Sequence, residues 1–296
     1  MKRKTWKKRY AGLLPAAPAL AGFAVFYFVP FLIMVWYSLS FGMGKRTFVG
    51  LANFRELFEN EMFLLAVRNT CRFLAVGVSV ILVLSFLLAW LLSRLVRGEH
   101  TFKMIYLYPM VVPIASVVLI VQFLWGDTGI ANRVLELMGK ESADWLHSSR
   151  TFWVLCILYW WKFTGYHVLI FFARLQMLPK EYFESARLDG AGTGKILRYV
   201  TLPLMAPVFL FNLLLAVMNA FKCYREAFLL GGNYPHDSIY LLQHFMNNSF
   251  ESLNYQKIST ASVTLMAGIL LLVLAGGLLY ILTRRGKHGR TKQRKA

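Results

Sequence analysis

Charged residues are scarce in this chain of 296 residues, at 16% of the sequence against 57% hydrophobic residues. Soluble globular domains carry about a quarter charged residues and about half apolar ones. Cysteine is also scarce, because only Cys71, Cys156 and Cys223 occur and no CxxC pair is present. This leaves no support for a disulfide framework or a cysteine zinc site, and we expect three buried thiols. The composition indicates a membrane protein.

Catalytic motifs are missing as well. The six histidines do not group at metal-ligand spacing, and neither GxSxG nor HExxH occurs. The segment 189–195 is similar to a phosphate-binding loop, but Asp189 and Ile196 stand where the Walker A pattern needs a glycine and a Ser or Thr. We therefore expect no catalytic residues, no metal site and no cofactor in this chain, and no ATP binding by the chain itself.

Long apolar runs dominate what is present. A helix that crosses a hydrocarbon core of about 30 Å needs about 20 apolar residues. Strands of a membrane barrel would be about 10 residues long and would alternate, which these runs do not. The sequence therefore predicts an all-α membrane protein with six transmembrane helices, in the stretches Leu13–Phe41, Phe73–Leu95, Phe102–Trp125, Thr151–Phe172, Leu204–Leu230 and Ile258–Leu282.

The formal net charge of +19 is distributed unevenly between the predicted loops. With the N-terminus inside, nearly all of the excess positive charge lies in the cytoplasmic segments, whereas basic and acidic residues balance in the outer segments. The positive-inside rule then predicts a plasma (inner) membrane protein with both termini in the cytoplasm. The basic residues are dispersed at span ends instead of gathering on one face, which argues against nucleic acid as a partner.

Several irregular features are expected along the chain. Apolar residues at helical spacing from Phe54 predict a short helix within the outer segment 42–68, and a second is expected around Asn132–Met138. The first span should be kinked or irregular, because it contains Pro15, Pro18 and Pro30.

The longest cytoplasmic loop, residues 173–203, contains a predicted short amphipathic helix. Pro179 suits its first turn, and its apolar side combines Tyr182, Phe183, Ala186 and Leu188. The residues Gly190, Gly192 and Gly194 should break this helix, and Pro203 and Pro207 should open the next span. Such a helix can lie on lipid or dock into a groove of a partner, and the residues alone leave both open.

The same loop carries a resemblance. Glu184-Ser185-Ala186, Gly190, Val200 and Leu202-Pro203 resemble the EAA motif, EAA-x3-G-x9-I-x-LP, of ABC importer permease subunits. The departures are Ser185 for the second Ala and Val200 for Ile. Other segments resemble segments of the sugar-permease branch of this family, the subunits of maltose-type and glycerol-phosphate-type importers, and occur in the same order along the chain. They are FVGLANF (48–54), NTCRF (69–73), YPMVVP (108–113), GIANRVL (129–135), ARLQMLPKEYFESARLDGA (173–191) and YQKISTAS (255–262).

This resemblance covers nearly the whole chain and implies a type I ABC importer permease fold. Residues 1–66 would form a basic segment, the first transmembrane helix and an outer interfacial segment, residues 67–282 the permease core, and residues 283–296 a basic cytoplasmic tail. The implied partners are a second homologous permease subunit, two ATP-binding-cassette ATPase subunits, an extracytoplasmic sugar-binding protein and membrane lipid. The implied substrate is a carbohydrate, expected to be an oligosaccharide.

The resemblance also implies a role for the loop. Its short helix would sit in a cleft of the ATPase, where Glu184 would pair with a basic group and Gly190 would supply a sharp turn. The coupling residues implied in this way are Glu184, Ser185, Ala186, Asp189, Gly190, Leu202 and Pro203.

A candidate substrate face lies in the fourth stretch. Lys162 falls about ten residues into it, roughly 15 Å deep, where ionisable groups mark a pathway or a buried pair. Tyr166 lies on the same helix face as Lys162. In maltose-type permeases a tyrosine upstream of the motif's glutamate contacts the sugar, and Tyr166 stands at the same distance in sequence from Glu184. Other sugar contacts of these permeases lie on the fifth span. Of the corresponding positions in this chain, Asn219 keeps a strong hydrogen-bonding group. The alternative is that Lys162 extends toward the membrane surface or bonds to the partner permease subunit, and that Tyr166 only packs.

Other ionisable residues of the spans are few. Lys222 and Glu226 stand at i and i+4 and are expected to pair along one helix. A secondary transporter or channel that works alone would need its own coupling-ion site, and a membrane-embedded enzyme would need a catalytic pair. The spans, with only Lys162, Lys222, Arg225 and Glu226, offer little support for either alternative.

Overall fold

The computed structural model describes residues 13–42, 45–94 and 99–293. The predicted basic N-terminal segment, residues 95–98 and the last residues of the tail lie outside the described residues. The chain divides into two compact units, Met1–Glu61 with Met246–Ala296, and Met62–Phe245. Within the described ranges, six helical stretches are long and apolar enough to cross a membrane: Pro15–Ser38, Glu61–Leu92, Ile114–Leu137, Thr151–Gln176, Thr193–Gly231 and Tyr255–Leu278. The predicted all-α membrane class is confirmed.

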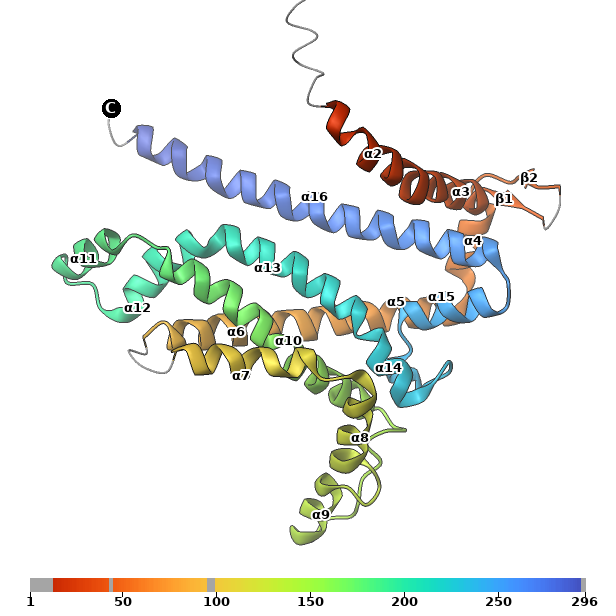
Figure 1. Ribbon diagram of the computed structural model, residues 1–296, viewed down its shortest axis with the longest axis horizontal. Helices are drawn as coiled ribbons and strands as arrows, with labels where there is room; N and C mark the ends of the chain where they lie inside the picture. The colour runs from red at the N-terminus through yellow and green to blue at the C-terminus, as the bar shows by residue number, and fades with distance from the viewer. Residues whose placement is uncertain (1–12, 43–44, 95–98, 294–296) are drawn as a thin grey trace, which may run out of the picture. The chain divides into compact units, whose positions relative to one another are not determined.

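The first unit begins with an irregular membrane helix. Helix α2 (Leu13–Phe23) passes through a π-helical turn (Ala24–Phe28) into α3 (Val29–Ser38). The π turn ends at Phe28, two residues before Pro30, which has no N–H to donate to the helix. The predicted irregularity of this span is therefore confirmed. Helix α16 (Tyr255–Gln293) packs along α3 (Figure 1).

A short hairpin and a helix complete the first unit. Strands β1 (Ser40–Phe41) and β2 (Thr47–Phe48) pair antiparallel, with Ser40 opposite Phe48. Strands of two residues have no hydrophobic alternation to detect, so the sequence did not predict them. The next helix, α4 (Ala52–Glu59), confirms the helix expected near Phe54 and contacts α16.

The second unit is built around α10 (Thr151–Gln176), the most buried of the six candidate spans. It packs against α6 (Ser79–Leu92), α7 (Glu99–Val111) and α13 (Leu202–Lys222). Aromatic residues fill these contacts, and Phe73, Phe152, Tyr159, Phe86 and Phe171 are all nearly inaccessible. The remaining helical elements are α8 (Ile114–Trp125), α9 (Ile130–Leu137), α11 (Lys180–Leu188), α12 (Thr193–Ile196), α14 (Tyr224–Gly231), a 3-10 turn (Asp237–Ile239) and α15 (Leu242–Glu251).

A glycine sets the distance between α10 and α7. A Cβ atom added at Gly165 would lie 1.6 Å from the carbonyl oxygen of Tyr106, far inside van der Waals contact. Small residues allow close backbone approach between membrane helices, where dispersion contacts replace the hydrophobic effect as the main attraction. The closeness of these two helices therefore depends on the absent side chain.

The second membrane helix is longer than predicted. Helix α5 (Glu61–Phe73) continues through a π segment (Leu74–Val78) into α6, so this span starts twelve residues before the predicted Phe73. Arg68 and Arg72 interrupt the apolar run, so hydropathy alone did not indicate that this helix begins before Phe73. The buried face of α5 does not include Cys71, which is exposed. The expectation of three buried thiols is wrong for this residue and confirmed for Cys156 and Cys223.

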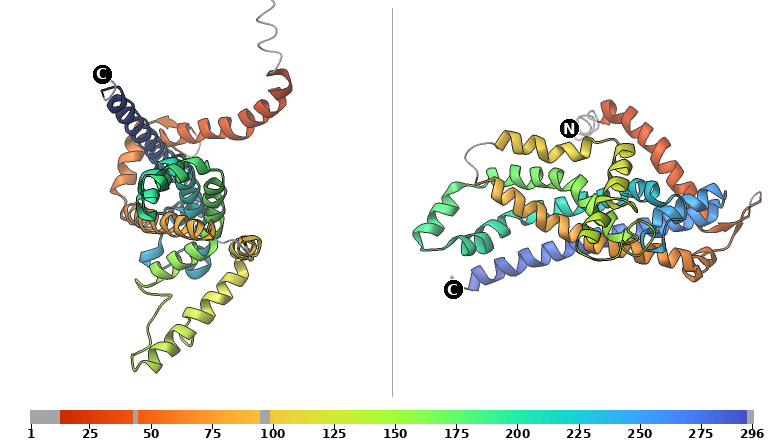
Figure 2. Two further views of the ribbon diagram at one scale, coloured as in Figure 1. Left: turned by 90° about the vertical axis from the view of Figure 1, so that its left-hand side faces the viewer. Right: turned by 90° about the horizontal axis from the view of Figure 1, so that it is seen from below.

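The third predicted stretch, 102–125, is not one helix. It is divided at Pro113 into α7 and α8, and α8 turns away from the line of α7 (Figures 1 and 2). Proline lacks the N–H for the helical ladder and disfavours the helical conformation of the preceding residue, Val112. Helix α9 confirms the helix expected around Asn132.

Candidate functional site

The helix predicted in the cytoplasmic loop is α11, which lies with α12 at one end of α10 and α13 (Figure 1). Its C-terminus is closed by two backbone bonds of 3.0 Å, from the Ala191 N–H to the Ala186 carbonyl and from the Gly190 N–H to the Arg187 carbonyl. Gly190 has φ +72°, the left-handed conformation that glycine adopts without strain. The sharp turn predicted at Gly190 is confirmed.

One side of α11 faces outward. Leu188 and Tyr182 are 89% and 55% exposed, and Glu184 is exposed as well. Of the other residues implied for coupling, Ser185, Asp189 and Gly190 are exposed and Ala186 is half-buried. The other side of α11 holds the helix in place, because Phe183 packs against a cluster that includes the buried Leu178. An exposed helix end with one anchored edge is suited to contact another chain.

The sequence placed the start of the fifth span too late. Helix resumes at Thr193 in α12 and runs through a π segment (Leu197–Thr201) into α13, so Gly194 lies inside helix. Pro203 therefore does not open the span. The π segment lies just before Pro203, which has no N–H to donate to the helical ladder. Leu202 and Pro203 are exposed near the start of α13, in the same helical run as the loop.

The three residues predicted to contact substrate lie on α10 and α13. Tyr166 is half-buried on α10, with its ring edge-on to His167 at a centroid distance of 5.4 Å. Asn219 is buried on α13, 3.5 Å from His167 Nε2. The side chain of Lys162 is 13% exposed and forms an ion pair with Glu226 of α14. The structure thus connects Tyr166 and Asn219 through His167, whereas Lys162 belongs to a separate pair.

The ion pair corrects an expectation. Glu226 pairs with Lys162 across two helices, and not with Lys222 along one helix. The reason is a break at Cys223, where α13 ends and α14 begins, so residues 222 and 226 are not one regular helical turn apart. The second carboxylate oxygen of Glu226 is buried and has no hydrogen-bond partner among the described residues.

A buried polar network joins α10 and α13. His167 Nδ1 lies 2.8 Å from Asn212 Oδ1, and the Asn212 amide donates to the His167 carbonyl at 3.3 Å. The Tyr159 hydroxyl donates to the Ala216 carbonyl at 2.8 Å. His167 and Asn212 were not predicted from the sequence. The available signal was a polar residue alone within an apolar run, which in a membrane usually faces the bundle interior.

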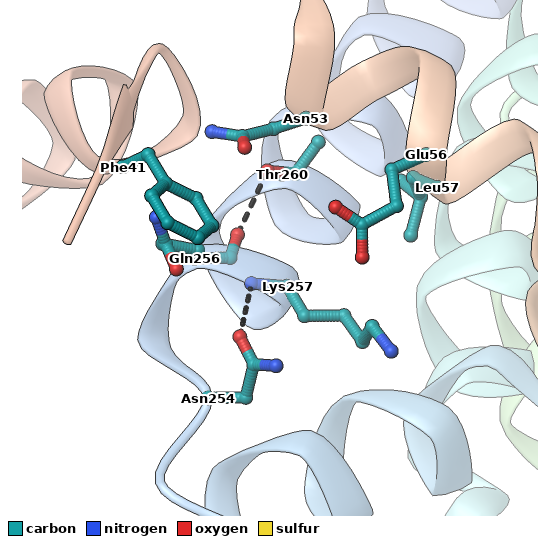
Figure 3. A pocket seen from close by; sticks show the side chains of 8 residues that line it. All are labelled: Phe41, Asn53, Glu56, Leu57, Asn254, Gln256, Lys257 and Thr260. Atoms are coloured by element: carbon teal, nitrogen blue, oxygen red, sulfur yellow. Dashed lines mark hydrogen bonds between the residues drawn. The ribbon is translucent and has the colours of Figure 1, made fainter. Parts of the chain in front are cut away.

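The first unit contains a small pocket that is lined by none of these residues. It has a volume of about 70 Å³ and is lined by Phe41, Asn53, Glu56, Leu57, Asn254, Gln256, Lys257 and Thr260 (Figure 3). The Asn53 amide donates to the carbonyls of Ser38 and Ser40, and the Gln256 amide also donates to Ser40. These amides hold the hairpin against α4 and α16, so the pocket has a structural explanation. Among the described residues, no cluster of His, Cys, Asp and Glu could hold a metal ion.

Six apolar helical stretches, with an exposed short helix between the fourth and fifth, define a multi-pass membrane protein. The sequence profile of the family described as "binding-protein-dependent transport system inner membrane component" matches residues 81–288. The chain belongs to this family of inner membrane transport components.

Curated relatives agree with this family. The chain is 31% identical over 235 residues to the arabinooligosaccharides transport system permease protein AraP of Bacillus subtilis, covering 77% of this chain and 74% of the relative. It is 30% identical over 260 residues to the sn-glycerol-3-phosphate transport system permease protein UgpA of Yersinia pestis, covering 84% and 86%. The predicted permease class is confirmed.

Solved structures show the same fold. A chain of a bacterial ABC transporter involved in the import of the acidic polysaccharide alginate superimposes with a TM-score of 0.79 at 19% identity, covering 94% of this chain and 98% of that chain. A second structure of a bacterial alginate ABC transporter, in complex with alginate pentasaccharide-bound periplasmic protein, gives a TM-score of 0.77 at 20% identity and covers 92% and 94%. The predicted ABC importer permease fold is confirmed.

Proposed function

We propose that this chain is the membrane-spanning permease subunit of an ATP-driven, binding-protein-dependent importer of a carbohydrate. The observation that carries the proposal is the glycine-closed helix α11, which presents Glu184 at the end of a bundle with the importer permease fold. The named relatives support a carbohydrate, because AraP is a permease for arabinooligosaccharides and the structural neighbours belong to alginate importers. An oligosaccharide fits both.

In this proposal α11 transmits the motion of the ATPase. The exposed face with Glu184, Ser185 and Asp189 would seat in a cleft of an ATP-binding-cassette subunit, where a basic group would pair with Glu184. The turn at Gly190 fixes the angle between α11 and the helical run that starts at Thr193. Because that run continues through Leu202 and Pro203 into α13, a displacement of α11 would move a membrane helix directly.

The proposed assembly follows from this role. Two ATPase subunits would hydrolyse ATP, a second homologous permease would complete the pore, and an extracytoplasmic binding protein would deliver the sugar. This chain would then need no cofactor of its own. The loop containing α11 would face the cytoplasm together with both termini, in accordance with the distribution of positive charge.

We place the substrate face on α10 and α13, around Tyr166. The half-buried ring of Tyr166 could stack on a sugar ring, and Asn219, linked to His167, could bond a hydroxyl. Lys162 would reach a ligand only after leaving Glu226, so it would act in a different conformational state from the one described.

Co-purification tests the proposal. A tagged version of this chain, expressed with its genomic neighbours, should bring down one ATPase and one further permease in stable amounts. Uptake by the reconstituted complex should require both ATP and the loaded binding protein. Uptake by this chain alone, without ATP, would contradict the proposal and would favour a stand-alone secondary transporter or channel. A sugar panel tested against the cognate binding protein would identify the substrate.

A further inference from the structure

A cavity of about 280 Å³ lies behind α11, between this helix and the ends of α6 and α10. Three cationic side chains line it, Arg94 at the end of α6 and Lys180 and Arg187 on α11. The coupling residues Glu184 to Ala186 are not part of its lining. The cavity is therefore on the anchored side of α11, and the function proposed above does not use it.

The described lining contains no carboxylate. Within the described ranges, none of these three cations forms an ion pair, although the Arg94 guanidinium lies 3.9 Å from the centre of the Trp90 ring. Like charges around one small cavity repel each other, and a bound anion would remove that repulsion. Arg and Lys together bind phosphate groups through charge-assisted hydrogen bonds. Polar groups of Ser93, Gln176, Thr193 and Thr201 also line the cavity.

The rest of the lining is apolar, which points to an amphipathic ligand. It consists of Trp90, Leu175, Leu178, Phe183, Ile196 and Leu197. On α6, Leu84, Leu87 and Leu91 are 37%, 44% and 55% exposed at spacings of three and four residues, and Arg94 follows two residues after the helix ends. One face of α6 thus offers an apolar path that ends at the cations. A free inorganic anion would not need this path.

We propose that the cavity binds the phosphate headgroup of an anionic phospholipid, with an acyl chain along the Leu84, Leu87 and Leu91 face of α6. The cavity lies where α6 and α10 end, which is where lipid phosphates are found beside membrane helices. Basic pockets between spans at the cytoplasmic side are a known physical means of binding anionic headgroups. A lipid bound there would pack against the anchored side of α11.

The first experiment compares lipids on the complete, delipidated transporter complex in neutral detergent. Native mass spectrometry would follow binding of phosphatidylglycerol, phosphatidylcholine and inorganic phosphate. We expect phosphatidylglycerol to bind at least tenfold more tightly than phosphatidylcholine, and a large excess of inorganic phosphate not to displace it. Equal binding of the two lipids would overturn the proposal. Complete displacement by inorganic phosphate would overturn it as well, and would leave a site for free anions.

The second experiment compares two matched double variants of the complex. Arg94→Gln with Lys180→Gln removes one arginine and one lysine from the cavity, and about 30-fold weaker phosphatidylglycerol binding is expected, since each basic residue contributes about fivefold. Lys195→Gln with Arg198→Gln removes the same charges from exposed positions outside the lining, and binding should be retained.

A third variant is a control for misfolding of the neutral cavity variant. Arg94→Lys with Lys180→Arg preserves both charges, and it should retain binding within about threefold because the headgroup attraction depends mainly on charge. Equal weakening by the cavity pair and by the pair outside the lining would contradict the proposal, because general surface charge would then explain the binding. If the neutral cavity variant does not assemble, the lipid comparison on the wild-type complex and the charge-preserving variant decides the question.

Discussion

Lys162 of α10 and Glu226 of α14 form a buried ion pair that connects two helices 64 residues apart in the chain. Their side chains are only 13% and 2% exposed. Charged groups within membrane helices are costly and are found in pairs or at functional pathways. The pair gives α14 a fixed position against the central helix, at the break after α13.

Removal of one partner should destabilise the protein more than removal of both. Lys162→Met leaves Glu226 charged and buried, and the expected loss is about 3–5 kcal/mol of unfolding free energy. The double variant Lys162→Met with Glu226→Met should recover most of that loss. Thermal unfolding of the purified complex measures both. Lys222→Met is the control, because Lys222 is exposed and should change stability by less than about 0.5 kcal/mol. An equal effect of Lys222→Met would contradict the assignment of the pair.

A single methyl group at Gly165 should separate α7 from α10. Because the added Cβ would lie 1.6 Å from a backbone carbonyl oxygen, Gly165→Ala requires a helix to move, with an expected cost of about 3 kcal/mol or more. Gly268→Ala is the control, since a Cβ at Gly268 meets no atom within 4 Å. Thermal unfolding of both variants checks the prediction. Similar melting temperatures for the two would show that the close approach is not needed.

The stability of the second unit should depend on pH through His244. Burial lowers the pKa of His244 from 6.5 to about 4, and its Nδ1 accepts a hydrogen bond from the Leu241 N–H at 3.0 Å. The unfolded chain therefore takes up this proton first. Stability should be complete above pH 6.5 and fall as the pH decreases toward 4, by up to about 3 kcal/mol.

The control for this prediction is a second histidine. The free energy of unfolding, measured between pH 7 and pH 5, should lose part of its pH dependence in His244→Asn. His236→Asn should keep the pH dependence, because His236 is exposed. An unchanged pH dependence in His244→Asn would contradict the buried neutral state.

Much of the fold follows from hydropathy alone, because a bilayer requires long apolar helices and little else can satisfy the backbone within it. The turn at Gly190 was predictable as well, since a glycine directly after an amphipathic helix indicates a left-handed end. Breaks in the third and fifth spans were harder to predict. At Pro113 a local breaker lies within an apolar run, and at Cys223 the sequence gives no breaker at all.

The polar contacts between helices could not be predicted. Glu226 has a lysine four residues away in sequence, yet its partner is Lys162 on another span. The choice depends on how α10 packs against α14, which a periodicity argument does not contain. The same holds for His167, whose two amide neighbours come from α13.

The substrate face predicts a selective transport defect. Tyr166→Ala should lose stacking and hydrogen bonding worth about 1–3 kcal/mol and weaken sugar uptake accordingly, while the complex still assembles. Trp153→Ala removes a ring from an exposed position of the same helix and should transport normally. Uptake by reconstituted complexes, with basal ATPase activity as the assembly check, distinguishes the two. Full transport by Tyr166→Ala would remove this face from the pathway.

ATP-driven sugar uptake in proteoliposomes measures whether α11 couples ATP hydrolysis to transport. Gly190→Val places a branched side chain at φ +72°, whereas Gly192→Val changes a residue at φ −68° with no atom near its Cβ position. We expect Gly190→Val to insert normally but to lose ATPase association and at least nine-tenths of uptake, roughly the effect of a 1–2 kcal/mol strain. Gly192→Val should retain both. Normal ATPase association and uptake in Gly190→Val would contradict a coupling role for α11.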